Sequence, residues 1–145
     1  VHAQRLLHRS VHIMVFNTKR ELFLQKRVLT KDENPGLWDT SSAGHVNAGE
    51  DYVSSAQREL KEELGITANL RFLCKFQACS ETCWEHVAVF TCVSDDSIVI
   101  DPGEISEGRF YSLDEIKNDL QDDAGRFTST FLKLFEHYRE LNEKS

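Results

Sequence analysis

The sequence predicts one domain of the α/β (α+β) class, in which helices cover a mostly mixed β-sheet. Several short stretches alternate between apolar and polar residues, as half-buried strands do. Two longer stretches place apolar residues at helical spacing. The chain has 145 residues, of which 40% are hydrophobic and 28% charged, so it can form one hydrophobic core without disulfide support. We therefore expect a single domain over residues 1–145.

The first third of the chain is expected to form strands. Residues 7–16 (LHRSVHIMVF) end in β-branched and apolar residues, and residues 21–28 (ELFLQKRV) resume the alternation after a polar turn. These two stretches are predicted to pair as a hairpin. A polar loop at 30–36 contains a Pro-Gly turn signal, and residues 37–43 are expected to be a short extended segment.

An amphipathic helix is expected next, and one flank of it is crowded with acids. At about 100° per residue, its core-facing stripe comprises Val53, Ala56, Leu60 and Leu64. Glu59, Glu62 and Glu63 lie beside that stripe, and Gly65 stands where a C-cap glycine ends a helix. A solvated acidic face is one interpretation. The other is a metal site, because such crowded carboxylates repel one another unless a cation lies among them.

The second half of the chain continues with strands and helices. Residues 70–80 and 85–93 are predicted strands, and residues 107–111 a further short one. Ser112 and Glu115 have the spacing of a capping box, so we expect a helix from there to about residue 120. A terminal amphipathic helix is predicted from apolar residues at three- and four-residue steps, namely Phe127, Phe131, Leu134, Phe135 and Tyr138.

Charge and hydropathy exclude some classes of partner. The net charge of −7 argues against binding a nucleic-acid polymer, which would favour a basic face. No apolar run approaches the roughly 20 residues that span a bilayer, and no secretory signal is visible. We therefore expect a cytoplasmic protein without a membrane partner.

The cysteines are expected to be free thiols. They are Cys74, Cys79, Cys83 and Cys92. Without a sign of secretion, buried thiols are the expected state. A zinc site that also uses His86 is the alternative, but the sequence contains no CxxC pair, which structural zinc sites favour.

The helix and the loop before it resemble the Nudix box at every defined position. Gly44 is followed after five residues by Glu50, and after seven more by the run RELKEELGI at 58–66. The hairpin before the box and the segment GEISEGRFYSLDEI after the last long strand also resemble that family. The resemblance implies the Nudix fold, a mixed β-sheet sandwiched between α-helices. It also implies hydrolysis of a nucleoside diphosphate linked to another group, X.

The same resemblance assigns roles to the residues of the box. Glu59, Glu62 and Glu63 would bind Mg²⁺ or Mn²⁺, which prefer oxygen ligands, and the Gly44 carbonyl is a further candidate ligand. Either Glu59 or Glu62 would accept the proton of the attacking water. The structural residues would be Glu50 and Arg58, as a salt bridge between loop and helix, together with Gly65.

The flanking segments resemble those of isopentenyl-diphosphate isomerases. Isomerases of this kind use a cysteine before the Gly-His pair as an acid/base, but Ala43 stands there and carries no transferable proton. His8, His45 and Glu85 match isomerase metal ligands, whereas Cys83 replaces another. Shared ancestry alone would also explain these matches. The intact box and Ala43 favour a hydrolase. An isomerase-like enzyme and a non-catalytic sensor of nucleotide diphosphates are the alternatives.

Several other residues are candidates for supporting roles. Glu85 or Glu104 could supply a further metal ligand or the base, and His8 and His45 could assist. Arg9, Lys26 and Arg27 are candidates for phosphate contacts, although solvated surface explains them equally well. His12 is expected to be a packed histidine. Trp38 and Trp84 could stack on X, with burial in the core as the favoured interpretation. The expected partner is a small-molecule diphosphate, and a homodimer is compatible with the family.

Overall fold

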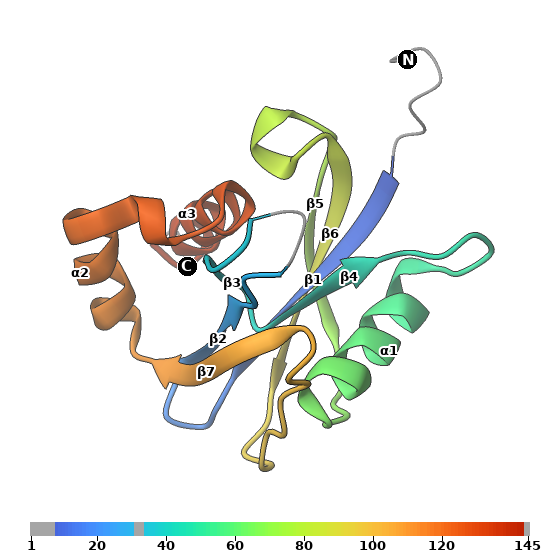
Figure 1. The fold of residues 1–145 in the computed structure, drawn as a ribbon, viewed down its shortest axis with the longest axis horizontal. Coiled ribbons are helices and arrows are strands. Elements are labelled where there is room, and N and C mark those ends of the chain that lie inside the picture. The colour runs from blue at the N-terminus through green and yellow to red at the C-terminus, as the bar shows by residue number, and fades with distance from the viewer. Residues whose placement is uncertain (1–7, 31–33, 144–145) are drawn as a thin grey trace.

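The fold is a mixed β-sheet between two layers of helices (Figure 1). The computed structural model describes residues 8–30 and 34–143. Its strands are β1 (His8–Phe16), β2 (Leu22–Arg27), β3 (Trp38–Asp39), β4 (Ser42–His45), β5 (Arg71–Phe76), β6 (Glu85–Val93) and β7 (Ile105–Tyr111). Its helices are α1 (Tyr52–Leu64), α2 (Leu113–Asp123) and α3 (Ser129–Glu143), with short 3₁₀ turns η2 (Ser80–Thr82) and η3 (Ala124–Arg126).

β1 is the central strand that joins the two parts of the sheet. It runs parallel to β6 along its whole length and antiparallel to β4 on its other side. β6 continues to β5, and β2 pairs antiparallel with both β7 and β3. Parallel and antiparallel pairs therefore occur in one sheet, as the sequence predicted.

The alternation of β1 directs its side chains into two separate cores. Val11, Ile13 and Val15 face α1, whereas Met14 and Phe16 face α3. All five side chains are buried. In Figure 1, α1 lies on one side of the strands, and α2 and α3 lie on the other. The predicted sandwich of sheet between helices is therefore confirmed.

The predicted hairpin of the first two strands is only partly correct. β1 and β2 pair at a single register position, Phe16 with Leu22. Beyond it the strands separate, and Ser41 lies between them. The Ser41 hydroxyl donates to the Phe23 carbonyl at 2.5 Å and accepts from the Val15 amide at 2.8 Å. One buried side chain thus satisfies backbone groups that a longer hairpin would have paired.

Smaller differences concern the ends of elements and one face. The strand predicted over 70–80 ends at Phe76, and the helix that begins after Ser112 extends to Asp123. Ser112 and Glu115 form the predicted capping box. Val53 was expected in the core stripe of α1 but is 48% exposed.

The cysteines differ from one another in burial. All four are free, but only Cys92 is buried, and Cys83 is exposed. The expectation of buried thiols is therefore wrong for Cys83, which lies at a turn rather than in a strand. Within the described residues, no helix is both long and apolar enough to cross a bilayer.

Candidate functional site

The helix α1 is held at both ends and along its buried stripe. The Asp51 side chain accepts from the Ser54 amide at 2.7 Å, which caps the N-terminus. Gly65 ends the helix in the left-handed region at φ 70°, as a C-cap glycine does. Leu60 and Leu64 are fully buried. The acidic flank of α1 is thereby fixed against β4.

Glu59 lies directly over the backbone of β4. An ideal Cβ on Gly44 would overlap the Glu59 carboxylate, so a side chain at this position would displace that carboxylate from the strand. Burial raises the pKa of Glu59, although its hydrogen bond with Arg58 opposes this, and the charges of Glu62 and Glu104 add to the rise. The Gly44 backbone and the Glu59 carboxylate are therefore neighbours, as the predicted ligand set requires.

Glu63 is the most buried of the three box glutamates, with 7% of its surface exposed. Its Oε1 accepts from the Ser42 hydroxyl at 2.8 Å, the Ala43 amide at 3.1 Å and the Gln25 amide at 3.5 Å. Burial nevertheless raises the pKa of Glu63 to about 7, with a further contribution from neighbouring carboxylates. One oxygen of Glu63 is thus held by protein donors in a site that disfavours its charge.

Arg58 connects the loop before α1 to the acidic flank. Its Nε and Nη2 donate to the two oxygens of Glu50, each at 3.0 Å. These bonds and the Ser55 hydroxyl lower the pKa of Glu50 to about 2. Nη1 of Arg58 contacts Glu59 at 2.7 Å and Glu62 at 3.3 Å. The predicted Glu50–Arg58 pair is present in the structure, and the same guanidinium bridges two candidate metal ligands.

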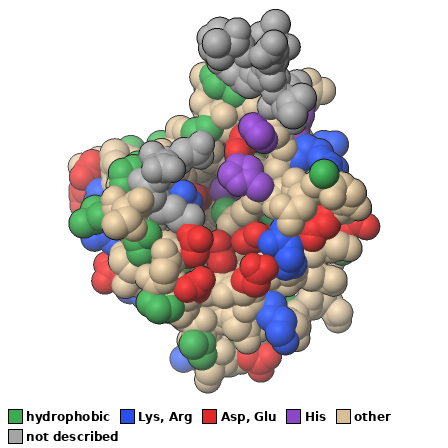
Figure 2. All heavy atoms as spheres, turned by 45° about the vertical axis from the view of Figure 1, so that its right-hand side comes forward, with side chains coloured by type: hydrophobic (Ala, Val, Ile, Leu, Met, Phe, Trp, Pro, Cys, Tyr) green, Lys and Arg blue, Asp and Glu red, His purple; other side chains and the backbone are tan. Residues whose placement is uncertain are grey.

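The acidic cluster has the donor chemistry of a site for a hard cation. Figure 2 shows acidic side chains gathered on the face of α1 and β4, below histidine side chains. Glu104 belongs to this neighbourhood, because its charge raises the pKa of both Glu59 and Glu63. Among the described residues, no three acidic, histidine or cysteine side chains already have metal-binding geometry, and Arg58 supplies positive charge instead. Carboxylate oxygens are suitable ligands for Mg²⁺ or Mn²⁺. Arg58 would compete with such an ion for Glu59 and Glu62, because its guanidinium contacts both.

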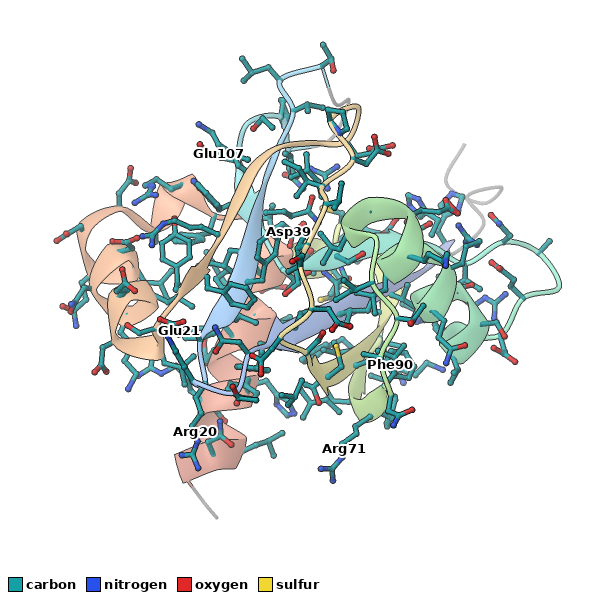
Figure 3. The ribbon with its side chains drawn as sticks, turned by 90° about the horizontal axis from the view of Figure 1, so that it is seen from below. Arg20, Glu21, Asp39, Arg71, Phe90 and Glu107 are labelled. Atoms are coloured by element: carbon teal, nitrogen blue, oxygen red, sulfur yellow. The ribbon has the colours of Figure 1, made fainter. Side chains whose placement is uncertain are left out.

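A small cavity of about 90 Å³ lies on the other face of β4. It is lined by Ser10, His12, Arg27, Asn34, Asp39, Ala43, Gly44, His45, Cys83, Glu85 and Thr130. Asp39 is 3% exposed and lies inside the molecule in Figure 3, where Arg20 and Arg71 extend outward. Gly44 therefore lines the cavity and also lies against the Glu59 carboxylate of the acidic cluster.

The other predicted histidine and glutamate candidates lie on the cavity side. His45 Nε2 and Glu85 Oε2 are 2.5 Å apart. Burial opposes ionisation of Glu85, but the hydrogen bond and charge of His45, together with Ser10 and the charge of His12, outweigh it and lower the pKa. The exposed His8 ring is 6.0 Å from that of His45. Of the two candidates for a further ligand, Glu104 thus lies with the box glutamates, and Glu85 does not.

The predicted substrate contacts have different surroundings. Arg27 lines the cavity, and its Nη1 lies 3.7 Å from Asp39 Oδ2. Arg9 lies on β1, and its guanidinium donates to the Glu50 carbonyl, just before α1, at 3.4 Å. Trp38 is 7% exposed and packs against Tyr111 in the core, which is the packing role favoured above.

The buried polar run that ends at Ser42, a donor to Glu63, was not predicted from the sequence. Asp39, Thr40, Ser41 and Ser42 are all 3% exposed or less. A run of four small polar residues inside an otherwise apolar region was the available signal. Because buried polar groups need partners, such a run indicates a hydrogen-bonded support rather than a surface loop.

The chain belongs to the Nudix family. The family model described as the NUDIX domain matches residues 6–132. This confirms the family that the box predicted, and it covers the sheet, α1, the cavity and most of the helical layer on the other face.

Relatives of two kinds are similar to this chain. An uncharacterized Nudix hydrolase of Pseudomonas aeruginosa is 43% identical over 110 residues, which is 72% of this chain and 63% of that protein. One from Yersinia pestis is 40% identical over 72% of this chain and 58% of that protein. The chain thus aligns with less than two thirds of either relative. An isopentenyl-diphosphate Delta-isomerase of Pectobacterium atrosepticum is 31% identical over 92% of this chain and 78% of the isomerase.

Solved structures agree on the fold. A crystal structure of a Deinococcus radiodurans protein has a TM-score of 0.77 and 26% identity, over 92% of this chain and 82% of that one. The NUDIX domain of Shewanella oneidensis NrtR, solved with ADP ribose, has a TM-score of 0.77 at 18% identity, over 96% and 90% of the two chains. At that identity the second similarity concerns the fold alone.

Proposed function

We propose that this chain is a metal-dependent Nudix hydrolase that cleaves the diphosphate bond of a nucleoside diphosphate linked to a group X. The observation that carries the proposal is that the carboxylates of two box glutamates, both on α1, lie against one short strand, β4. Glu59 lies against Gly44, and Glu63 is held by Ser42 and Ala43. This arrangement supports a site where carboxylate oxygens and the Gly44 carbonyl face an anionic substrate.

Each residue of the box has a role in this proposal. Glu59, Glu62, Glu63 and the Gly44 carbonyl would hold Mg²⁺ or Mn²⁺. When bound, such an ion neutralises the diphosphate and makes water a stronger nucleophile. Glu59 or Glu62 accepts the proton of that water. Arg58 keeps these two carboxylates side by side, since it contacts both.

Substitution of the candidate carboxylates tests the proposal. Glu59→Gln and Glu62→Gln should each lower kcat about 10²- to 10⁴-fold with a panel of nucleotide diphosphates and Mg²⁺ or Mn²⁺, while circular dichroism shows an intact fold. Glu136→Gln is the matched control, because Glu136 is exposed on α3, across the sheet. Full activity in both box variants would refute the assignment.

An isomerase is the second candidate, favoured by the similarity to isopentenyl-diphosphate isomerases over most of the chain. Ala43 lines the cavity where those enzymes would need a proton donor. We therefore expect no dimethylallyl diphosphate when the protein is incubated with isopentenyl diphosphate and Mg²⁺. Formation of that product would replace the hydrolase proposal, and ligand binding without any turnover would favour a sensor.

A further inference from the structure

The cavity beside β4 is placed to receive part of a substrate held at the acidic cluster. Ser10 and His12 lie on the face of β1 that points away from α1, because they continue the row of Met14. Gly44 lines the cavity and also lies under the Glu59 carboxylate. The cavity and the Glu59 carboxylate are therefore separated only by β4, so a group bonded to a diphosphate at Glu59 lies near the cavity.

Ser10 offers the cavity a hydroxyl group that lacks a hydrogen bond. Its side chain is 97% buried, since only 3% of the residue is exposed. The hydroxyl lies close enough to Glu85 to help lower the pKa of that carboxylate. Within the described part of the chain, however, Ser10 Oγ has no hydrogen bond of acceptable geometry. Buried hydroxyl groups are normally hydrogen-bonded, so a ligand in the cavity could supply the partner that Ser10 lacks.

His12 offers the cavity an acceptor. His12 Nδ1 lies 2.8 Å from the Thr40 hydroxyl and 3.7 Å from Asp39 Oδ1, and the nearby carboxylate favours the ring proton on the nitrogen that faces it. A proton on Nδ1 leaves the lone pair on Nε2. Burial lowers the pKa of His12, even though Asp39 opposes this. The ring is therefore neutral at pH 7, and Nε2 accepts.

The charges of the cavity wall are matched within the protein. Asp39 lies 3.7 Å from Arg27, and Glu85 is hydrogen-bonded to His45. A ligand therefore meets a hydroxyl and an imidazole acceptor rather than an unmatched charge. The volume of about 90 Å³ corresponds to roughly three water molecules in the liquid. A small polyol fragment is of comparable size.

We propose that this cavity binds a hydroxyl-bearing part of X, such as a glycerol or sugar fragment, with Ser10 and His12 as the residues that select it. The proposal rests on the proposed function, because the diphosphate has to lie at the acidic cluster. Ser10 Oγ and His12 Nε2 bind the hydroxyl groups, and Ala43 supplies an apolar wall. A substrate without hydroxyl groups leaves the Ser10 hydroxyl without a partner and binds less tightly.

Matched esters test this selection. We would measure the Kd of α,β-methylene ADP esters with Mg²⁺ by calorimetry, comparing 2,3-dihydroxypropyl with propyl. These analogues resist hydrolysis, so binding is read independently of turnover. The wild type should bind the dihydroxypropyl ester at least about 10-fold more tightly. Ser10→Ala and His12→Gln should each remove most of that preference and leave the propyl ester within about twofold. Ser54→Ala, on the exposed first turn of α1, should keep it.

The outcomes bear differently on this proposal and on the proposed function. Equal binding of the two esters overturns the cavity assignment, as does a preference that survives in Ser10→Ala and His12→Gln. Binding of neither ester contradicts both proposals, because both place a diphosphate at the acidic cluster. Tighter binding of a 3-aminopropyl ester overturns the choice of a neutral hydroxyl group. Absence of hydrolysis of the normal esters, with the binding preference intact, contradicts the hydrolase proposal alone.

Discussion

Glu63 is a buried carboxyl group whose charged form is disfavoured by burial, and a bound cation would offset this. Its Oε1 has three donors from β2 and β4, yet its pKa remains raised to about 7. Desolvation of a carboxylate is therefore only partly offset by hydrogen bonds. At neutral pH the metal-free protein keeps a carboxylate ready to ionise beside other acids, where an added cation would be stabilising.

Glu63 should make the metal-free protein less stable as the pH rises. The folded pKa of about 7 lies above the unfolded value of about 4.5, so the folded state retains a proton that the unfolded state has lost between these pH values. The free energy of unfolding should fall across this window, by on the order of 3 kcal/mol at most. Glu63→Gln should remove this loss. Urea unfolding from pH 4.5 to 8 in EDTA measures it.

Glu136→Gln serves as the control for that experiment, since Glu136 is exposed. It should keep the wild-type pH dependence. A Glu63→Gln protein whose stability falls with pH as steeply as the wild type would show that another group causes the loss.

The segment from β3 to β4 supplies buried polar groups both to the sheet and to the site. It separates β1 from β2 and supplies buried polar groups to both sides. A hydrophobic strand in this place would leave the Val15 amide and the Phe23 carbonyl without partners. The polar run is therefore part of the sheet's hydrogen bonding and also part of the site.

Ser41→Ala should destabilise the fold more than a serine substitution usually does. It removes the acceptor for the Val15 amide and the donor to the Phe23 carbonyl, both inside the core. Two unsatisfied backbone groups should cost about 2–4 kcal/mol. Ser54→Ala, on the surface of α1, should stay within about 0.5 kcal/mol of the wild type. Denaturant unfolding of both variants decides whether Ser41 is the link between the strands.

For the whole molecule, the sequence predicted the class of fold because periodicity depends on neighbours along the chain. Val53 and the separated hairpin show the limit. Which face of the first helical turn is covered depends on which elements pack against it, and strand pairing beyond Phe16 depends on Ser41, far along the chain. The box spacing fixed the position of Glu59 relative to Gly44. The cavity could not be foreseen, since Ser10, Asp39 and Glu85 meet only in the folded protein.

Divalent cations should stabilise the whole protein through the acidic cluster. An ion that binds only the folded state at 100 times its Kd adds about 2.7 kcal/mol to the free energy of unfolding. Mg²⁺ or Mn²⁺ should therefore raise the Tm by several degrees, although Arg58 competes for Glu59 and Glu62. The Glu59→Gln, Glu62→Gln double variant should lose most of this rise in calorimetry. An equal rise in both proteins would place the ion elsewhere.

The two tryptophans of the chain lie in opposite surroundings, which gives the molecule two separate optical signals. Trp38 is 7% exposed in the core, whereas Trp84 is 52% exposed between Cys83 and Glu85, which both line the cavity. Blue-shifted emission from Trp38 follows the integrity of the fold. Red-shifted emission from Trp84 responds to quenchers in the solvent. Unfolding and the accessibility of the surface at Trp84 can thus be followed in one unlabelled sample.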